Sequence, residues 1–251
     1  MELDPVLLSR VQFAFTIAFH ILFPTLTIGL SAFLAVSEGL WLKTGNPVYR
    51  DLYKFWVKIF ALAFGMGVVS GIPMSFQFGT NFSIFSSATG NVLGPLLGYE
   101  VLTAFFLEAS FLGIMLFGWN RVGNRLHFVA TCAVAFGTAL SAFWILSANS
   151  WMQTPAGFTI DENGIYHIES WWAAIFNPSF PYRLIHMLMA SWLTTGFVIA
   201  AISAFYLWRR QHHDFGKTAL RIVVPALAVL APLQLFIGDQ HGLNTLEHQP
   251  M

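Results

Sequence analysis

Five long apolar runs dominate the chain, and each is long enough for an α-helix that crosses a bilayer. The runs are Val11–Val36, Ile59–Phe78, Val92–Trp119, Leu126–Ala148 and Leu184–Trp208. A helix needs about 20 such residues, because each adds 1.5 Å against a hydrocarbon thickness of about 30 Å. A sixth run, Ile222–Ile237, reaches this length only with flanking residues such as Ala219 and Leu220. The pattern predicts an all-α membrane protein, a bundle of about six transmembrane helices in one membrane-embedded region, residues 1–251.

Composition supports a membrane location. Hydrophobic residues make up 56% of the 251 positions and charged residues only 10%, against about 25% in soluble domains. The mean hydropathy is +0.65. The net charge is zero, which gives no reason to expect nucleic acid. The acidic N-terminus lacks the positive region of a cleaved signal peptide, so we expect the first run to persist as a helix.

Basic residues predict the orientation. Placing the N-terminus on the outer, periplasmic side assigns ten of the twelve Lys and Arg residues to inward-facing connections. These ten are Lys43, Arg50, Lys54, Lys58, Arg121, Arg125, Arg209, Arg210, Lys217 and Arg221. Only Arg10 and Arg183 then face outward, which is a strong positive-inside bias. The longest connection, 149–182, is expected outside, and its stretch His167–Phe176 forms either a short interfacial helix or an ordinary surface loop.

Four titratable residues lie inside the apolar runs: Glu100 and Glu108 in the third, His20 in the first and His186 in the fifth. Charge at membrane depth costs several kcal/mol unless it meets a partner, a proton or water. In a regular helix Glu100 lies roughly 10 Å below the outer end, and Glu108 about 12 Å deeper and turned by ~80°. This spacing favours two steps along a path over a close carboxylate pair.

The two intramembrane histidines favour haem. Imidazole is a good ligand for haem iron, and His20 and His186 either sandwich one haem or hold one each. The alternative is that each forms a hydrogen bond between helices. Pro24 removes the hydrogen bond that would end on the carbonyl of His20, so we expect a kink there. The remaining histidines are interpreted as solvated: His127, His167, His212, His213, His241 and His248.

The two acids favour proton movement, because acids at membrane depth commonly mark proton relays. Lys58, at the inner end of the second run, is either a snorkelling anchor or the mouth of a proton path. Two functional classes are open on these residues alone. One is a haem-b electron-transfer protein without oxygen reduction, and the other is a cofactor-free proton-coupled transporter. A purely structural scaffold is disfavoured, since all four residues would then be uncompensated costs.

Several motifs, in order along essentially the whole chain, resemble subunit I of cytochrome bd-type quinol oxidases. They are Arg10-Val-Gln-Phe-Ala-Phe-Thr, His20 with Pro24, Phe76-Gln-Phe-Gly-Thr-Asn81, Gly98-Tyr-Glu100, Ala104-Phe-Phe-Leu-Glu108, Trp144-Ile-Leu-Ser-Ala-Asn149, Trp151-Met-Gln-Thr-Pro155, His186 and Gly238-Asp-Gln-His-Gly242. The family's subunit continues beyond the position of Met251, so the chain is expected to correspond to its N-terminal part.

The resemblance implies a role for each of the four titratable residues inside the apolar runs. His186 would be an axial ligand of the low-spin haem b. His20 would be a ligand in the pair formed by a high-spin haem b and haem d, or a second high-spin haem b, where oxygen is reduced. Which haem of this pair the histidine holds differs between members. Glu100 and Glu108 would deliver protons to the pair, with Lys58 on the route from inside.

The resemblance also implies that Gly238, Asp239 and Gly242 begin the quinol-binding loop. A Ser follows the second acid in many relatives, whereas here Ala109 stands there and Ser110 comes next. The implied activity is oxidation of a membrane quinol near the outer face, with reduction of O2 to water and protons drawn from the cytoplasmic side. The implied partners are a second oxidase subunit and small single-helix subunits, in the bacterial inner (cytoplasmic) membrane.

Overall fold

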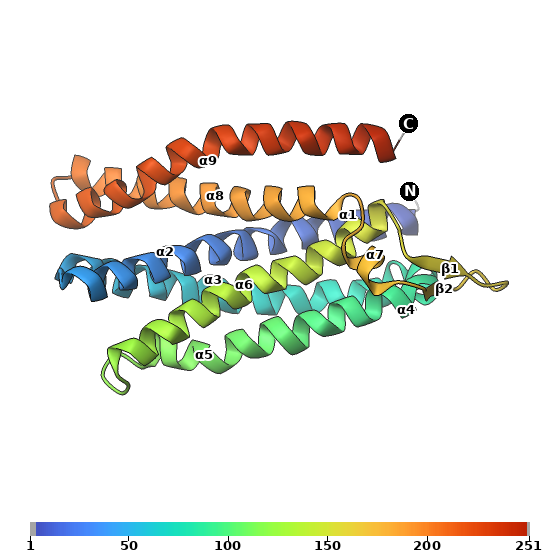
Figure 1. Cartoon of the computed structure of the whole chain (residues 1–251), viewed down its shortest axis with the longest axis horizontal. Helices are drawn as coiled ribbons and strands as arrows, with labels where there is room; N and C mark the ends of the chain where they lie inside the picture. Colours follow the sequence, from blue (N-terminus) through green and yellow to red (C-terminus); the bar gives the residue numbers. More distant parts are fainter. Residues whose placement is uncertain (1–3, 250–251) are drawn as a thin grey trace.

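The computed structural model describes residues 4–249, which form a bundle of long helices lying side by side (Figure 1). In chain order the elements are α1 (Pro5–His20), α2 (Leu22–Thr44), α3 (Pro47–Thr80), α4 (Ser83–Tyr99), the π-helix η1 (Glu100–Phe105), α5 (Phe106–Phe117), α6 (Asn124–Gln153), β1 (Phe158–Ile160), β2 (Tyr166–Ile168), α7 (Trp171–Ile175), α8 (Phe180–Trp208) and α9 (His213–His248). Among the described residues, six helical segments are long and apolar enough to cross a membrane. The predicted all-α membrane bundle is therefore confirmed.

The sixth predicted span is the long helix α9. It extends well beyond the apolar run Ile222–Ile237 at both ends, because Ala219 and Leu220 and further polar residues are also helical. Two prolines, Pro225 and Pro232, lie inside it. Helix α9 is therefore long enough to cross the membrane as the sixth span.

Local sequence sets where the helices begin and end. Asp4 caps α1 by accepting a hydrogen bond from the amide of Val6, and Asn46 caps α3 through the amide of Val48. A proline follows each cap at the first helical position, where its missing N–H costs nothing. Gly45 ends α2 in the left-handed conformation, with φ of 69°, which only glycine adopts without strain.

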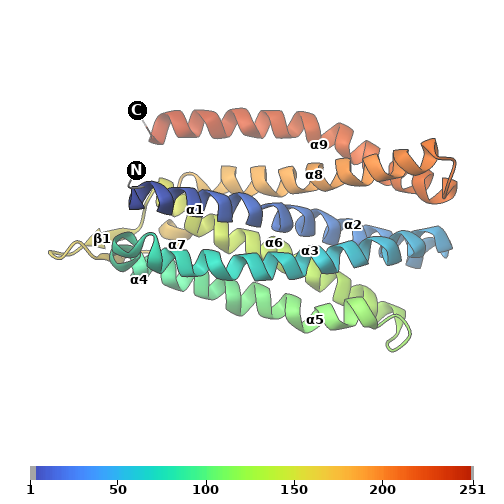
Figure 2. The same cartoon turned by 180° about the vertical axis from the view of Figure 1, so that it is seen from behind.

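Helix α2 lies at the centre of the bundle and packs against α3, α6 and α8. The pair α8 and α9 lies on one side of it, and α4 with α5 lies on the other (Figure 2). At Gly29 a β-carbon would collide with Thr195 of α8. The missing side chain lets the backbones of α2 and α8 approach closely, as small residues do at membrane helix contacts.

Two apolar clusters form the interior. The larger joins α2, α3, α5, α6, α8 and α9 around Leu34, Trp56 and Phe60, which are fully buried. The smaller joins α4, α6 and α7 around Leu96 and Trp151. By contrast, large apolar side chains such as Phe15 and Leu62 are exposed around the outside, as expected for surfaces that face lipid rather than water.

The first span is interrupted at the predicted place. Residue Ile21 separates α1 from α2, one residue after His20 and three before Pro24. Pro24 has no N–H to donate to the carbonyl of His20, so the regular pattern of hydrogen bonds fails there. Ile21 keeps helical backbone angles, φ −62° and ψ −22°, so α1 and α2 together form one span.

Both described ends of the chain lie at the same end of the bundle as the β-hairpin formed by β1 and β2 (Figure 1). The stretch 167–176 forms the second strand of this hairpin and the short helix α7, where Trp172 is 74% exposed. The segments that carry the ten basic residues lie at the opposite end. The even number of spans agrees with the predicted topology, while the side that faces outward stays a prediction.

Candidate functional site

His20 lies at the end of α1 and faces α3. Its Nδ1 is 3.0 Å from the hydroxyl oxygen of Ser70. That hydroxyl also lies 2.7 Å from the carbonyl oxygen of Met66. A β-carbon on Gly71 would stand 3.3 Å from Cε1 of the imidazole. The ring is thus held between two neighbouring positions of α3, one polar and one without a side chain.

Polar side chains from two of the motifs join α1 to α3 beyond His20. Gln77 donates to the hydroxyl of Thr16 over 3.0 Å. Asn81 donates to the carbonyl of Ser9 and to the side-chain oxygen of Gln12, over 3.0 and 3.1 Å. These hydrogen bonds fix the position of α1 along α3, and therefore the height of the imidazole.

His186 lies on α8 and faces α9. Its Nδ1 is enclosed but has no hydrogen-bond partner among the described residues. A β-carbon on Gly238 would stand 3.5 Å from Cε1 of the ring. The ring of His241 is next to it, with centroids 5.9 Å apart, and Gln234 donates to the backbone carbonyl of His186. The imidazole is thus packed against α9, yet no described side chain hydrogen-bonds to its nitrogens.

The two acids both face α6. Ser141 donates to Oε1 of Glu100 over 2.7 Å. Glu108 is 6% exposed, and its Cγ lies 2.6 Å from where a β-carbon on Gly137 would be. Gly137 and Ser141 are four residues apart, so they occupy one face of α6. Oε1 of Glu108 is enclosed and has no partner within residues 4–249.

The expectation that the acids point some 80° apart assumed a regular helix and is wrong. Residues from Glu100 to Phe105 form a π-helix, whose i→i+5 hydrogen bonds hold an extra residue in the turn. One extra residue shifts the helix face by about 100°, which nearly cancels the offset. Thr103 in this segment accepts a hydrogen bond from the indole of Trp144 over 2.8 Å. The π-helix therefore aligns both acids with α6.

Lys58 and Ser110 make no hydrogen bond to the two acids that face α6. Lys58 is exposed on α3, with no hydrogen bond or ion pair to any residue from Asp4 to Gln249. The hydroxyl of Ser110 donates to the backbone carbonyl of Phe106, one turn earlier on its own helix. Ser110 therefore offers no hydrogen bond to Glu108 in place of the hydroxyl that Ala109 lacks.

One buried site was missed from the sequence, where His127 was interpreted as solvated. The side chain of His127 is 1% exposed, and its Nδ1 donates to Oε1 of Glu38, which is fully buried, over 2.6 Å. Thr131 donates to the other carboxylate oxygen, also over 2.6 Å, and Tyr53 contacts the hydroxyl of Thr131 at 2.9 Å. The network links α2, α3 and α6. The signal available was an acid two residues beyond the end of one apolar run and an imidazole at the second position of another.

The other histidines divide into two groups. His167, His212, His213 and His248 are exposed, as predicted, whereas His241 is half-buried beside His186. Gly238, Asp239 and Gly242, predicted to begin a loop, lie inside the last turns of α9, which continues to His248. The helical backbone is what brings Gly238 against His186.

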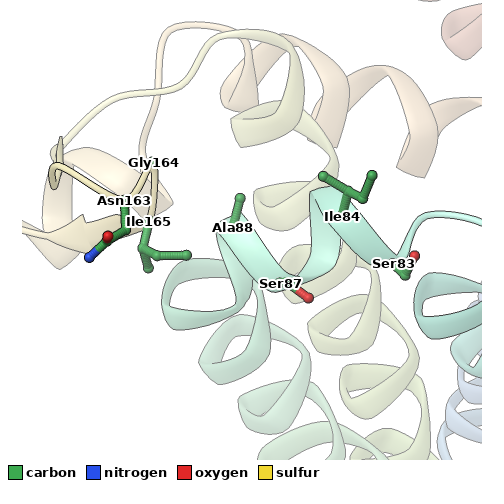
Figure 3. A pocket seen from close by; sticks show the side chains of 7 residues that line it. All are labelled: Ser83, Ile84, Ser87, Ala88, Asn163, Gly164 and Ile165. Atoms are coloured by element: carbon green, nitrogen blue, oxygen red, sulfur yellow. The ribbon is translucent and has the colours of Figure 1, made fainter.

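A shallow hollow of about 440 Å3 lies where the tip of the hairpin meets the start of α4 (Figure 3). Its lining residues are Ser83, Ile84, Ser87, Ala88, Asn163, Gly164 and Ile165. None of these side chains titrates or carries charge near neutral pH. The hollow therefore holds no side chain suited to acid–base chemistry near neutral pH.

This chain is similar to known proteins over almost its whole length. The family model for cytochrome bd terminal oxidase subunit I matches residues 8–251. The chain is 41% identical to cytochrome bd-II ubiquinol oxidase subunit 1 of Escherichia coli (strain K12), over 99% of this chain and 48% of that protein. It is 38% identical to cytochrome bd ubiquinol oxidase subunit 1 of Bacillus subtilis (strain 168), over 99% of this chain and 53% of that protein.

The fold has a match among solved structures. The bd oxidase from Geobacillus thermodenitrificans superposes with a TM-score of 0.91 at 32% identity, covering 98% of this chain and 57% of that one. The chain thus spans about half the length of the curated relatives it matches. With the family model matching almost every residue, the chain belongs to the cytochrome bd terminal oxidase subunit I family.

Proposed function

We propose that this chain works in a membrane quinol oxidase, where it holds haem iron through His20 and His186. The relatives' names, ubiquinol oxidase subunit 1, support the reaction: oxidation of a membrane quinol and reduction of O2 to water. The observation that carries the proposal is the state of the two imidazoles. Each is positioned by its neighbours, and each retains a nitrogen that no described residue binds.

The two histidines fit two separate haem groups better than one shared group. His20 packs against α3, through Ser70 and Gly71, whereas His186 packs against α9, through Gly238. The haems, when bound, supply the one-electron chemistry that carries electrons from quinol to dioxygen. We assign His186 to the low-spin haem b, and His20 to the pair of a high-spin haem b with haem d or a further haem b.

Glu108 and Glu100 would pass protons to the oxygen site. Glu108 has an enclosed carboxyl oxygen with no partner, so it can hold a proton without breaking a hydrogen bond. Ser141 contacts Glu100 one helical turn along α6. Protons would enter near Lys58, at the inner end of the bundle. They would therefore be drawn from the cytoplasmic side of the bacterial inner membrane.

The quinol would bind at the outer end of α9. Asp239 is exposed there and Gly238 contacts His186, so the segment from Gly238 to Gly242 links the quinol side to the imidazole. The working enzyme would include a second oxidase subunit and small single-helix subunits. All of these lie in the lipid bilayer.

The test is quinol-dependent oxygen uptake by the intact oxidase complex. Wild-type complex should consume O2 with a reduced quinol, and Glu108→Gln should slow uptake while the haem spectra persist. Ser110→Ala is a matched control, because its hydroxyl bonds only to its own helix. A complex with haem spectra but no uptake would favour the haem-b electron-transfer protein. A colourless complex would favour the transporter.

A further inference from the structure

The hydroxyl of Ser70 faces two groups at once, and these fix where its hydrogen points. It lies 2.7 Å from the carbonyl oxygen of Met66, a distance typical of a hydroxyl donating to an acceptor. Without a hydrogen between them, two oxygens at this distance would face each other lone pair to lone pair. Ser70 therefore donates to the backbone of its own helix.

This donation sets the tautomer of His20. Since the hydrogen of Ser70 is used, its oxygen can only accept from Nδ1 of the imidazole, 3.0 Å away. Nδ1 then carries the proton of the neutral ring, and Nε2 has a bare lone pair. Nε2 makes no hydrogen bond to residues 4–249 and is not enclosed by them. A bare, accessible ring nitrogen is what a metal ion binds.

We infer that Ser70 is the residue that positions His20 for haem iron. Its hydroxyl donates to the Met66 carbonyl, and its oxygen accepts a hydrogen bond from Nδ1–H of the imidazole, which leaves Nε2 to face the metal. The inference rests on the proposed function, in which His20 is a haem ligand. Histidines that bind metals almost always donate their other ring N–H to such a partner, which orients the ring and raises its basicity.

The surroundings restrict the ring to this role. Ser70 is 8% exposed, so water competes little for its hydroxyl. Gly71 allows the edge of the imidazole to approach to 3.3 Å of a β-carbon position, where a side chain would press on Cε1. The carbonyl of Gly67 lies 3.2 Å from the same hydroxyl and is a second acceptor beside the imidazole of His20.

The test compares three variants in the intact oxidase complex. Ser70→Ala removes the acceptor, Ser70→Thr keeps a hydroxyl, and Ser75→Ala is the matched control. Ser75 lies on the same helix and donates to its own backbone at Gly71, but it contacts no imidazole. The readouts are the iron–histidine stretching frequency, the midpoint potential of the His20-ligated haem and the retention of that haem on dilution.

Ser70→Ala should lower the stretching frequency and raise the midpoint potential, because a less basic imidazole stabilises ferric iron less. Haem retention should fall by about 10- to 100-fold. Ser70→Thr and Ser75→Ala should match the wild type. Identical frequency, potential and retention in Ser70→Ala would overturn the inference. If Ser70→Ala fails to assemble, Ser70→Cys takes its place, because a thiol is a weaker acceptor of similar size. Ser70→Cys should then raise the midpoint potential as well, and an unchanged potential would overturn the inference.

His20→Ala separates this inference from the proposed function. Loss of one haem in His20→Ala, with no effect of Ser70→Ala, would leave His20 as the ligand and remove only the role of Ser70. Retention of every haem in His20→Ala would remove the proposed ligand itself. In that case any shift caused by Ser70→Ala would arise from a different contact, and the inference would fall with the proposal.

Discussion

His127 donates from Nδ1 to Oε1 of Glu38 over 2.6 Å, between side chains that are at most 1% exposed and 89 positions apart in the sequence. Thr131 donates to the second oxygen of the same carboxylate. Both carboxylate oxygens of Glu38 thus meet a buried hydrogen-bond donor. The pair can therefore be buried where a lone carboxylate could not.

Breaking this pair should destabilise the bundle. Glu38→Ala or His127→Ala leaves one buried partner alone, and each should lower the free energy of unfolding by about 3–5 kcal/mol. The double variant Glu38→Leu with His127→Phe should recover most of that loss, because both members of the pair are replaced by apolar side chains and Thr131 keeps its hydrogen bond to Tyr53. Thermal unfolding of the complex in detergent measures these changes.

The exposed pair Asp161 and His167 is the matched control, since it has the same chemistry at the surface. Asp161→Ala should leave the unfolding temperature of the bundle unchanged. Equal effects at the two pairs would contradict the burial argument.

Glu108 should depend on the absence of a side chain at position 137. Gly137→Ala places a β-carbon 2.6 Å from Cγ of Glu108, closer than any real contact, so the acid must move. Oxygen consumption should fall by about 10- to 100-fold, as for a misplaced catalytic group, while haem spectra persist. Gly113→Ala on α5 is the control, because nothing lies within 4 Å of its added carbon. Normal turnover in Gly137→Ala would contradict the assigned role.

The hairpin should loosen in acid. His167 and the backbone amide of Ile165 hydrogen-bond to Asp161 and lower the pKa of its carboxyl below the ordinary 3.8. A lowered pKa means that the stabilisation is present above 3.8 and is lost as the pH falls through the folded value. The amides of Asn163 and Ile165 donate to Asp161 Oδ1, and their protection from hydrogen exchange, relative to the intrinsic rate at each pH, should fall over that range. In Asp161→Asn the added acid dependence should be absent, and its persistence would point to another group.

The positive-inside bias predicts which end of the bundle faces the periplasm. In a variant with Cys132 replaced by Ser, a single cysteine at Asn163 should react with an impermeant maleimide in intact spheroplasts. A cysteine at Arg121 should react only after permeabilisation, because its loop lies at the opposite end. The reverse labelling pattern would show that the predicted orientation is wrong. The proposed direction of proton uptake would then be wrong as well.

The spans could be predicted from the sequence because apolar length is a local property of the chain. The break at Ile21 could also be predicted, because Pro24 lacks an N–H. The candidate residues His20, His186, Glu100 and Glu108 stood out for the same local reason, as titratable groups within apolar runs. Their roles remain predictions that the experiments described above test.

The relative placement of these groups could not be predicted. The π-helix at Glu100 depends on packing between η1 and α6, through Thr103 and Trp144. The network of Glu38 and His127 depends on a contact between helices distant in sequence. The contact between the hydroxyl of Ser70 and His20 exists only because α1 packs against α3. A periodicity argument treats each helix alone and cannot supply such contacts.

Haem iron held by the imidazoles of α1 and α8 should leave a distinct spectral signature for each histidine. Reduced-minus-oxidised spectra of the purified complex, with the wild type, His186→Ala and His20→Ala side by side, test it most directly. His186→Ala should lose the low-spin haem b signal, and His20→Ala should alter only the signals of the oxygen-reducing pair. Wild-type spectra in both variants would contradict it.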